Sequence, residues 1–220
     1  MKRVLCYGDS NTWGDTPKQP NVRYSAQVRW PGRLQIYAGP LLQIIEEGLN
    51  GRTTGLEDPN QAGRNGLTYL GPCLESQNPL DLVILMLGIN DLNKKYINTF
   101  SPTELEVRVR ALIKLTKTLG KTASGQVPEI LLVAPQLPRV ASIFYDAFVY
   151  PELEERARLW ESIYYKLALQ EKIHFVDLGS QVVSSPLDGI HLDPDQHEKI
   201  AQMIYHQVSG IFSLPDLPLT

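Results

Sequence analysis

The chain has 220 residues, of which 43% are hydrophobic and 20% are charged, and its formal net charge is −3. This length is sufficient for one sizeable α/β core, and because no linker-like stretch divides the sequence we expect a single domain over residues 1–220. The small negative charge provides no electrostatic attraction to nucleic acid or to anionic lipid, so neither is expected as a partner.

Two cysteines, Cys6 and Cys73, are too few for a disulfide framework and lack the spacing of metal ligands, so we expect two buried thiols. The basic residues at the start of the chain precede an apolar run that stops at Gly8, which is too short for the core of a signal peptide. No stretch approaches the ~18 apolar residues of a membrane span. We expect no signal peptide, no association with a membrane and a cytoplasmic location.

Five short apolar segments predict β-strands, and they alternate with segments that predict helices. The strands are expected at residues 3–8, 42–48, 82–87, 130–133 and 174–176. The helices are expected at about 30–37, 67–75, from 102 onward, 152–170 and 194–212. The uninterrupted apolar runs at 82–87 and 130–133 are typical of parallel strands covered on both faces. The pattern therefore predicts a doubly wound, three-layer α/β/α sandwich with a five-stranded parallel sheet.

Two connections are long enough to shape a binding site. Residues 15–29 are polar, contain Pro17 and Pro20, and are expected to form a loop beside the end of the first strand. Residues 135–151 contain three prolines and four aromatic side chains. Such a segment is either folded over the site or covered by another subunit, and we expect residues 144–150 to form the interface of a homo-oligomer.

Residues 7–14, with the sequence YGDSNTWG, place the hydroxyl of Ser10 directly after the first strand, where open α/β sheets bind ligands. A serine in this position is most often a helix cap, and as a nucleophile it needs a base to remove its proton. Asp188 and His191 are spaced so that the carboxylate can meet the Nδ1 proton of the imidazole and leave Nε2 free to act as that base.

The other three histidines are expected in regular structure, His174 at the start of a strand and His197 and His206 on the last helix, where packing or surface roles suit them better. His191 lies just before that helix. Asp193 is the expected N-cap, Pro194 takes the first position, and Gln196 is expected to reach back to the cap.

Two segments offer donors for an oxyanion. Gly51 follows the second strand and Asn90 follows the third, so both are expected at the edge of the sheet that carries Ser10. Gly51 is also a candidate turn residue with positive φ, and Asn90 a candidate turn cap. Trp13, one helical turn after Ser10, is expected either to form the wall of an acyl-binding pocket or to pack in the core.

Four ordered blocks resemble the SGNH (GDSL-type) hydrolase family over roughly residues 3 to 210: GDSNTWG at 8–14, EEGLNGRTT at 46–54, LDLVILMLG at 80–88 followed by Asn90, and DGIH at 188–191. The details of the first three are similar to the arylesterase/acyltransferase branch. Asn11 stands where the family has its name-giving Leu, which leaves the hydrolase class intact and the substrate preference open. The resemblance implies a flavodoxin-like fold, a Ser10–His191–Asp188 triad, and an oxyanion hole made by Ser10, Gly51 and Asn90.

We therefore expect a serine esterase that hydrolyses short-chain acyl or aryl esters through an acyl-enzyme on Ser10, with acyl transfer to alcohols or peroxide as a competing reaction. A carbohydrate acetylesterase and a thioesterase or lysophospholipase are alternatives. A nucleotide- or flavin-binding module on the same fold is the non-enzyme alternative. Because the sequence has no metal-binding motif and no phosphate-binding loop, we expect no metal and no cofactor.

Overall fold

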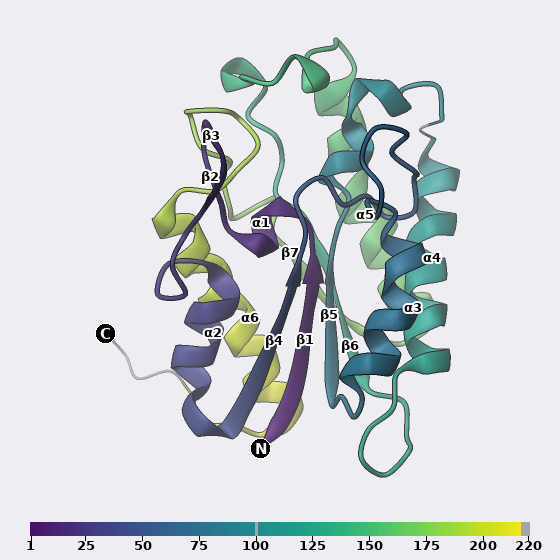
Figure 1. Cartoon of the computed structure of the whole chain (residues 1–220), viewed down its shortest axis with the longest axis vertical. Helices are drawn as coiled ribbons and strands as arrows, with labels where there is room; N and C mark the ends of the chain where they lie inside the picture. Colours follow the sequence, from purple (N-terminus) through teal and green to yellow (C-terminus); the bar gives the residue numbers. More distant parts are fainter. Residues whose placement is uncertain (100, 217–220) are drawn as a thin grey trace.

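The computed structural model describes residues 1–99 and 101–216 and is built around one parallel sheet (Figure 1). Its strands are β1 (Lys2–Gly8), β4 (Leu42–Gly48), β5 (Leu82–Met86), β6 (Glu129–Ala134) and β7 (His174–Asp177). They lie in the order β4-β1-β5-β6-β7, and every neighbouring pair is parallel. The five strands predicted from the apolar runs are therefore confirmed.

Helices cover both faces of the sheet, as Figure 1 shows. On one face lie α2 (Trp30–Ala38) and α6 (Pro194–Phe212), and on the other lie α3 (Gly66–Gln77), α4 (Pro102–Leu119) and α5 (Leu153–Glu171). This arrangement confirms the three-layer sandwich. No helix in the described part of the chain has both the length and the apolar character needed to cross a bilayer.

Strand β1 shows why the central strands are apolar throughout. Its side chains alternate between two cores: Val4 and Cys6 face α2 and α6, whereas Leu5 and Tyr7 face α3 and α4. All four are fully buried. A strand that is buried on both faces has no position left for a polar side chain, so its sequence does not alternate. Cys73 is also buried, and both thiols are free, as predicted.

The strand order makes a crevice at the carboxyl end of β1. The chain passes from β1 to β4 on one side and then returns to β5 on the other, so the loops that follow these strands diverge above β1. Such a switch point is where open α/β sheets bind ligands. The single-turn helix α1 (Ser10–Trp13) lies at this upper end of the sheet (Figure 1).

The segment predicted as a loop at 15–29 contains a small antiparallel hairpin instead. Its strands are β2 (Asp15–Thr16) and β3 (Gln19–Arg23). Proline lacks a backbone N–H for a β-ladder, so the two prolines in this segment weakened the strand signal in the sequence. The hairpin lies at the same end of the sheet as α1 (Figure 1).

Gly48, the last residue of β4, allows α1 to lie directly against the sheet. A Cβ atom on Gly48 would lie 2.2 Å from the backbone nitrogen of Trp13 and 2.6 Å from its Cα. Because both atoms belong to the backbone, they cannot move aside as a flexible side chain would. The position of α1, and of Ser10 within it, therefore depends on a glycine at position 48.

We predict that Gly48→Ala lowers the free energy of unfolding by about 1–3 kcal/mol, because the added methyl group overpacks a rigid contact. The matched control is Gly210→Ala in α6, where an added Cβ meets no atom within 4 Å. That variant should be as stable as the wild type or more stable by about 0.5–1 kcal/mol. Urea unfolding measures both variants, and equal stabilities would contradict the prediction.

His197, on α6, is buried against the start of α2. Its Nδ1 accepts a hydrogen bond from the backbone N–H of Trp30 (3.4 Å), and its ring meets the ring of Tyr24 edge-on at a centroid distance of 5.4 Å. Burial lowers the pKa of His197 to about 3, and the nearby positive charges of His191 and Arg29 act in the same direction. The imidazole is therefore neutral in the folded protein, which confirms a packing role.

We predict that His197 makes the protein sensitive to acid. An unfolded histidine titrates near pH ~6.5, so between that value and about 3 the unfolded chain binds a proton that the folded chain does not. The free energy of unfolding should fall as the pH is lowered through this range, by at most ~1.4 kcal/mol per pH unit from this residue. Urea unfolding between about pH 4 and 6 should show a shallower slope for His197→Gln. His206→Gln, on the exposed side of α6, is the control and should keep the slope of the wild type.

Candidate active site

Ser10 lies at the first position of α1, immediately above the end of β1. The side chain of Asp9 caps this helix by accepting a hydrogen bond from the N–H of Asn11 (2.9 Å), and Gly14 ends it in the left-handed conformation. Burial raises the pKa of Asp9 to about 7. At Gly8 a Cβ would lie 2.0 Å from Thr12 Oγ1, so only a glycine lets the chain turn this sharply. The turn holds Ser10 in place at the edge of the sheet.

A continuous chain of contacts joins Ser10 to the end of the sequence. The Oγ atom of Ser10 lies 3.1 Å from Nε2 of His191, and Nδ1 of His191 lies 2.8 Å from Oδ2 of Asp188. All three residues are buried, Asp188 completely. Ser10 thus joins two residues that follow it by 178 and 181 positions in the hydrogen-bonded row that nucleophilic catalysis by serine requires.

Asp188 is surrounded by donors. Its Oδ1 accepts the N–H groups of Ile190 (3.0 Å) and His191 (2.9 Å), and its Oδ2 also accepts the N–H of Lys18 (3.1 Å) from the turn of the β2–β3 hairpin. Burial alone would raise the pKa of Asp188, but the hydrogen bond and charge of His191 and the backbone donors outweigh burial and lower it to about 2. The carboxylate therefore stays ionised and keeps the proton of His191 on Nδ1, which leaves Nε2 as an acceptor.

The start of α6 differs from the predicted cap. Asp193 occupies the N-cap position, but its side chain accepts a hydrogen bond from Ser185 Oγ (2.9 Å) and makes no cap bond. The side chain of Gln196 accepts the N–H of Val183 (3.0 Å) and does not reach back to the cap. The predicted capping interaction is wrong because both side chains have partners in the preceding loop. These bonds fix the loop that carries Asp188 and His191 to the helix.

Ser10, Gly51, Asn90 and His191 line one cavity of about 340 Å³. Gly51 has a φ of +77°, a conformation that suits a turn residue. The position of Gly51 in the cavity wall is also compatible with its backbone N–H acting as a donor. Nδ2 of Asn90 donates to the backbone oxygen of Arg52 (3.1 Å). An amide NH₂ group carries two hydrogens, so this bond fixes the orientation of Asn90 and leaves one donor free for the cavity.

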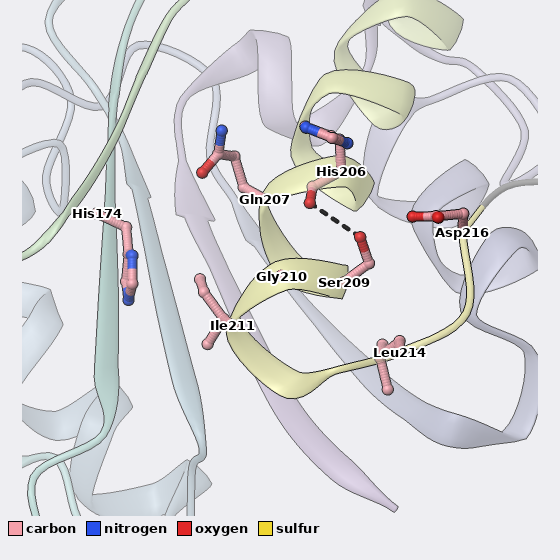
Figure 2. Close-up of a pocket in the computed structure, with 8 residues that line it drawn as sticks. All are labelled: His174, His206, Gln207, Ser209, Gly210, Ile211, Leu214 and Asp216. Carbon is pink, nitrogen blue, oxygen red and sulfur yellow. Dashed lines mark hydrogen bonds between the residues drawn. The ribbon is translucent and has the colours of Figure 1, made fainter.

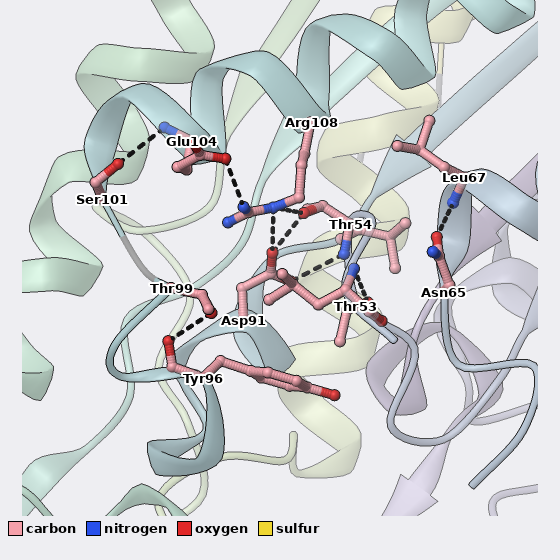
Figure 3. Close-up of polar contacts among 12 residues, drawn as sticks. Thr53, Thr54, Asn65, Leu67, Asp91, Tyr96, Thr99, Ser101, Glu104 and Arg108 are labelled. Atoms are coloured by element: carbon pink, nitrogen blue, oxygen red, sulfur yellow. Dashed lines mark hydrogen bonds and ion pairs between the residues drawn. The ribbon is translucent and has the colours of Figure 1, made fainter. Parts of the chain in front are cut away.

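Figure 3 shows a buried polar network among Thr54, Asp91 and Arg108. Thr54 follows Gly51 in the same loop and Asp91 follows Asn90, so the network ties the two segments together. Asp91 accepts the N–H (2.9 Å) and the hydroxyl of Thr54, and Nε of Arg108 on α4 lies 3.4 Å from Oδ1 of Asp91. Burial raises the pKa of Asp91, and the bonds from Thr54 and the charge of Arg108 oppose this effect. Asp91 thus acts as scaffold, because it couples the two segments that carry the candidate oxyanion donors.

Arg52 is a structural residue of the site that the sequence did not indicate. Its guanidinium lies over the ring of Tyr7 at 4.3 Å and over the ring of Tyr69 at 5.2 Å, and it donates to the backbone oxygen of Gly8 (2.9 Å). The rings come from β1 and α3, far from position 52 in the sequence. Arg52 connects the turn below Ser10 with the loop of Gly51, and no local motif predicts such a contact.

The aromatic segment folds over the site. The ring of Tyr145 meets that of His191 edge-on at 5.8 Å, and Phe148 is buried in the cavity wall. Phe144 and Val149 are more than half exposed on the same segment. The predicted subunit interface at 144–150 stays a prediction.

Trp13 and Asp15 lie on either side of the end of α1, and the structure gives them different surroundings. The guanidinium of Arg23 lies over the indole of Trp13, 5.2 Å from the ring centroid. Trp13 is not among the residues that line the cavity beside Ser10. Its role in acyl binding stays a prediction. Asp15, which the sequence did not indicate, lines that cavity, and its Oδ2 lies 3.7 Å from Nε2 of His191.

Figure 2 shows a second cavity, on α6 and the start of β7. It contains His174 and His206 but lies at the amino end of the strands, away from Ser10. The hydroxyl group in this cavity belongs to Ser209 and donates to the backbone oxygen of His206 (2.9 Å), so it is not paired with a side-chain base. In residues 1–99 and 101–216 no cluster of three or more His, Cys, Asp or Glu side chains could hold a metal ion. The cavity beside Ser10 is therefore the candidate active site.

Comparisons with known proteins identify the family and the fold of the chain. The model of the GDSL-like lipase/acylhydrolase family matches residues 6–199. The solved structure of an aryl esterase of M. smegmatis is 32% identical, with a TM-score of 0.87 over 96% of this chain and 99% of that one. Est24, a carbohydrate acetylesterase from Sinorhizobium meliloti, is 35% identical, with a TM-score of 0.88 over 96% of this chain and 100% of that one. The curated proteins give no match.

Proposed function

The chain belongs to the GDSL-like lipase/acylhydrolase family, and from this premise we propose that it is a serine esterase that cleaves short-chain acyl or aryl esters through an acyl-enzyme on Ser10. The observation that carries the proposal is the buried row of contacts from Ser10 Oγ to His191 Nε2 and from His191 Nδ1 to Asp188. Membership of an acylhydrolase family sets aside the alternative of a nucleotide- or flavin-binding module.

In the proposed reaction His191 Nε2 takes the proton of Ser10 as Oγ attacks the ester carbonyl. Asp188 holds the imidazole in place and stabilises the positive charge that forms on it. The backbone N–H groups of Ser10 and Gly51 and the side-chain amide of Asn90 are the proposed donors to the oxyanion. The N–H of Ser10 is free for this because the first residue of a helix has no intrahelical acceptor. The leaving alcohol takes the proton from Nε2, and water or another acceptor then releases the acyl group.

Polar side chains in the cavity favour a hydrophilic ester. Beside the reacting groups, the lining includes Asn21, Asn50, Gln61, Arg64 and Asn93. Amide and guanidinium groups of this kind can hydrogen-bond the hydroxyl groups of a sugar. A carbohydrate acetylesterase is therefore our second candidate, and the similarity to Est24 supports it. Comparing kcat/KM for acyl p-nitrophenyl, acyl-sugar and acyl-CoA substrates separates these candidates and also tests the thioesterase alternative.

We predict that Ser10→Ala keeps the fold and lowers esterase activity by about 10⁴-fold or more, because no other group in the row can accept the acyl group. Release of p-nitrophenol from its acetate measures the activity. Ser180→Ala, which removes an exposed hydroxyl outside the cavity, is the control and should retain full activity. A phosphonate inhibitor should label Ser10 stoichiometrically, and labelling of a different serine would refute the assignment.

Asn90→Ala should lower kcat by roughly 10²-fold with little change in KM, because its amide acts mainly when negative charge develops on the substrate oxygen. Asn98→Ala, at an exposed position outside the cavity, serves as the control. If KM rose while kcat stayed constant, Asn90 would bind the substrate in its ground state and would not be an oxyanion donor.

A further inference from the structure

A second carboxylate faces the proposed catalytic base. Asp15 begins β2 directly after α1, and only 5% of its surface is exposed. Its Oδ1 accepts the N–H of Asn21 (3.0 Å), and its Oδ2 lies 3.7 Å from Nε2 of His191, on the side of the ring opposite to Nδ1 and Asp188. Burial raises the pKa of Asp15, whereas the charge of His191 and hydrogen bonds from Asn21 and Asn50 lower it.

The distance between Oδ2 of Asp15 and Nε2 of His191 suits a small molecule that hydrogen-bonds to both. An oxygen that lies about 2.8 Å from both Nε2 and Oδ2 makes an angle of about 80° between them, so a single O–H-bearing molecule can reach both acceptors. Once Ser10 is acylated, its hydroxyl no longer donates to Nε2. The base is then free to accept a proton from the incoming acceptor, at a point that Asp15 also faces.

Water and simple alcohols differ in what they can offer this pair of acceptors. Water carries two hydrogens, so it can donate one to Nε2 and the other to Asp15. A monohydric alcohol carries one hydrogen, which must go to Nε2 if the alcohol oxygen is to attack. Its alkyl group then displaces water from Oδ2 of Asp15 and gives that oxygen no hydrogen bond in return. A 1,2-diol has a second hydroxyl that can reach Asp15.

We propose that Asp15 is a positioning residue for deacylation, and that with Nε2 of His191 it selects acceptors that present two O–H donors, water or a 1,2-diol, over monohydric alcohols. This rests on the proposed acyl-enzyme mechanism. Water forms a bond to the acyl carbon as one of its protons passes to Nε2. The bond from that carbon to Ser10 Oγ then breaks, and Nε2 returns the proton to Oγ. Asp15 accepts a hydrogen bond throughout and exchanges no proton.

The test is the fate of the acyl group in Asp15→Asn. This variant keeps an oxygen for the N–H of Asn21 but can place an NH₂ donor where Oδ2 faces His191. The enzyme is incubated with p-nitrophenyl acetate and equal concentrations of 1-propanol or 1,2-propanediol, and the ratio of new ester to acetate is measured. This ratio reports only on deacylation, so a general loss of activity does not change it.

In the wild type the ratio should be several-fold higher for 1,2-propanediol than for 1-propanol. In Asp15→Asn the ratio for 1-propanol should rise about tenfold, as expected for the loss of one hydrogen bond between water and a charged group, and the preference for the diol should disappear. Asp15→Ala should likewise raise the ratio for 1-propanol and remove the preference for the diol. Gln19→Ala, exposed in the same hairpin, should match the wild type.

Equal ratios for the two acceptors in the wild type would overturn the proposal without any variant. So would a ratio for 1-propanol in Asp15→Asn within twofold of the ratio in Gln19→Ala. Failure of the proposed function looks different, because p-nitrophenol would then not be released by the wild type, or would be released equally by Ser10→Ala.

Discussion

The site depends on one buried carboxylate. Asp188 accepts hydrogen bonds from the His191 ring, from two backbone N–H groups of its own turn and from the N–H of Lys18 in the hairpin. The hydrogen bond and charge of His191 and the two N–H groups of the turn outweigh the cost of burying the carboxylate. Because Oδ2 of Asp188 contacts both the imidazole and the N–H of Lys18, one group positions the proposed base and the β2–β3 hairpin. Removing the carboxylate would leave several buried N–H donors without an acceptor, and this would destabilise the folded loop around residues 185–191.

The sheet contributes a second constraint, which is close approach of backbone segments. Gly8 and Gly48 allow α1 to lie on the ends of β1 and β4, and the network of Asp91, Thr54 and Arg108 holds the Gly51 loop against the end of β5. Three segments that follow three neighbouring strands are thereby fixed relative to one another. This rigidity is what electrostatic stabilisation of an oxyanion requires, since donors that must reorganise during the reaction contribute little.

The sequence predicted those features whose signal is local. Apolar runs located all five strands. Local blocks also singled out Ser10, Gly51, Asn90 and His191, which the fold brings to one cavity, and Asp188, which contacts His191 behind it. The features it did not predict depend on partners distant in the sequence: Arg52 between Tyr7 and Tyr69, Arg108 beside Asp91, and Asp15 facing His191. Asp193 takes the expected N-cap position, but its side chain makes no cap bond because Ser185 in the preceding loop donates to the carboxylate.

The placement of Asp15 also bears on how this hydrolase can hold a second carboxylate beside its proposed base, His191. In the proposed mechanism a negative group near Nε2 stabilises the imidazolium that forms in each step. The same group is an alternative acceptor for the proton, and it competes with return of the proton to Ser10 or to the leaving group. At 3.7 Å the contact is longer than a hydrogen bond, so the Coulombic benefit remains while the proton still lies nearer to Ser10 Oγ at 3.1 Å. The hairpin fixes this distance, because Asn21 donates to Oδ1 of Asp15 and Lys18 donates to Asp188. It therefore determines whether Asp15 only stabilises the imidazolium or also takes its proton.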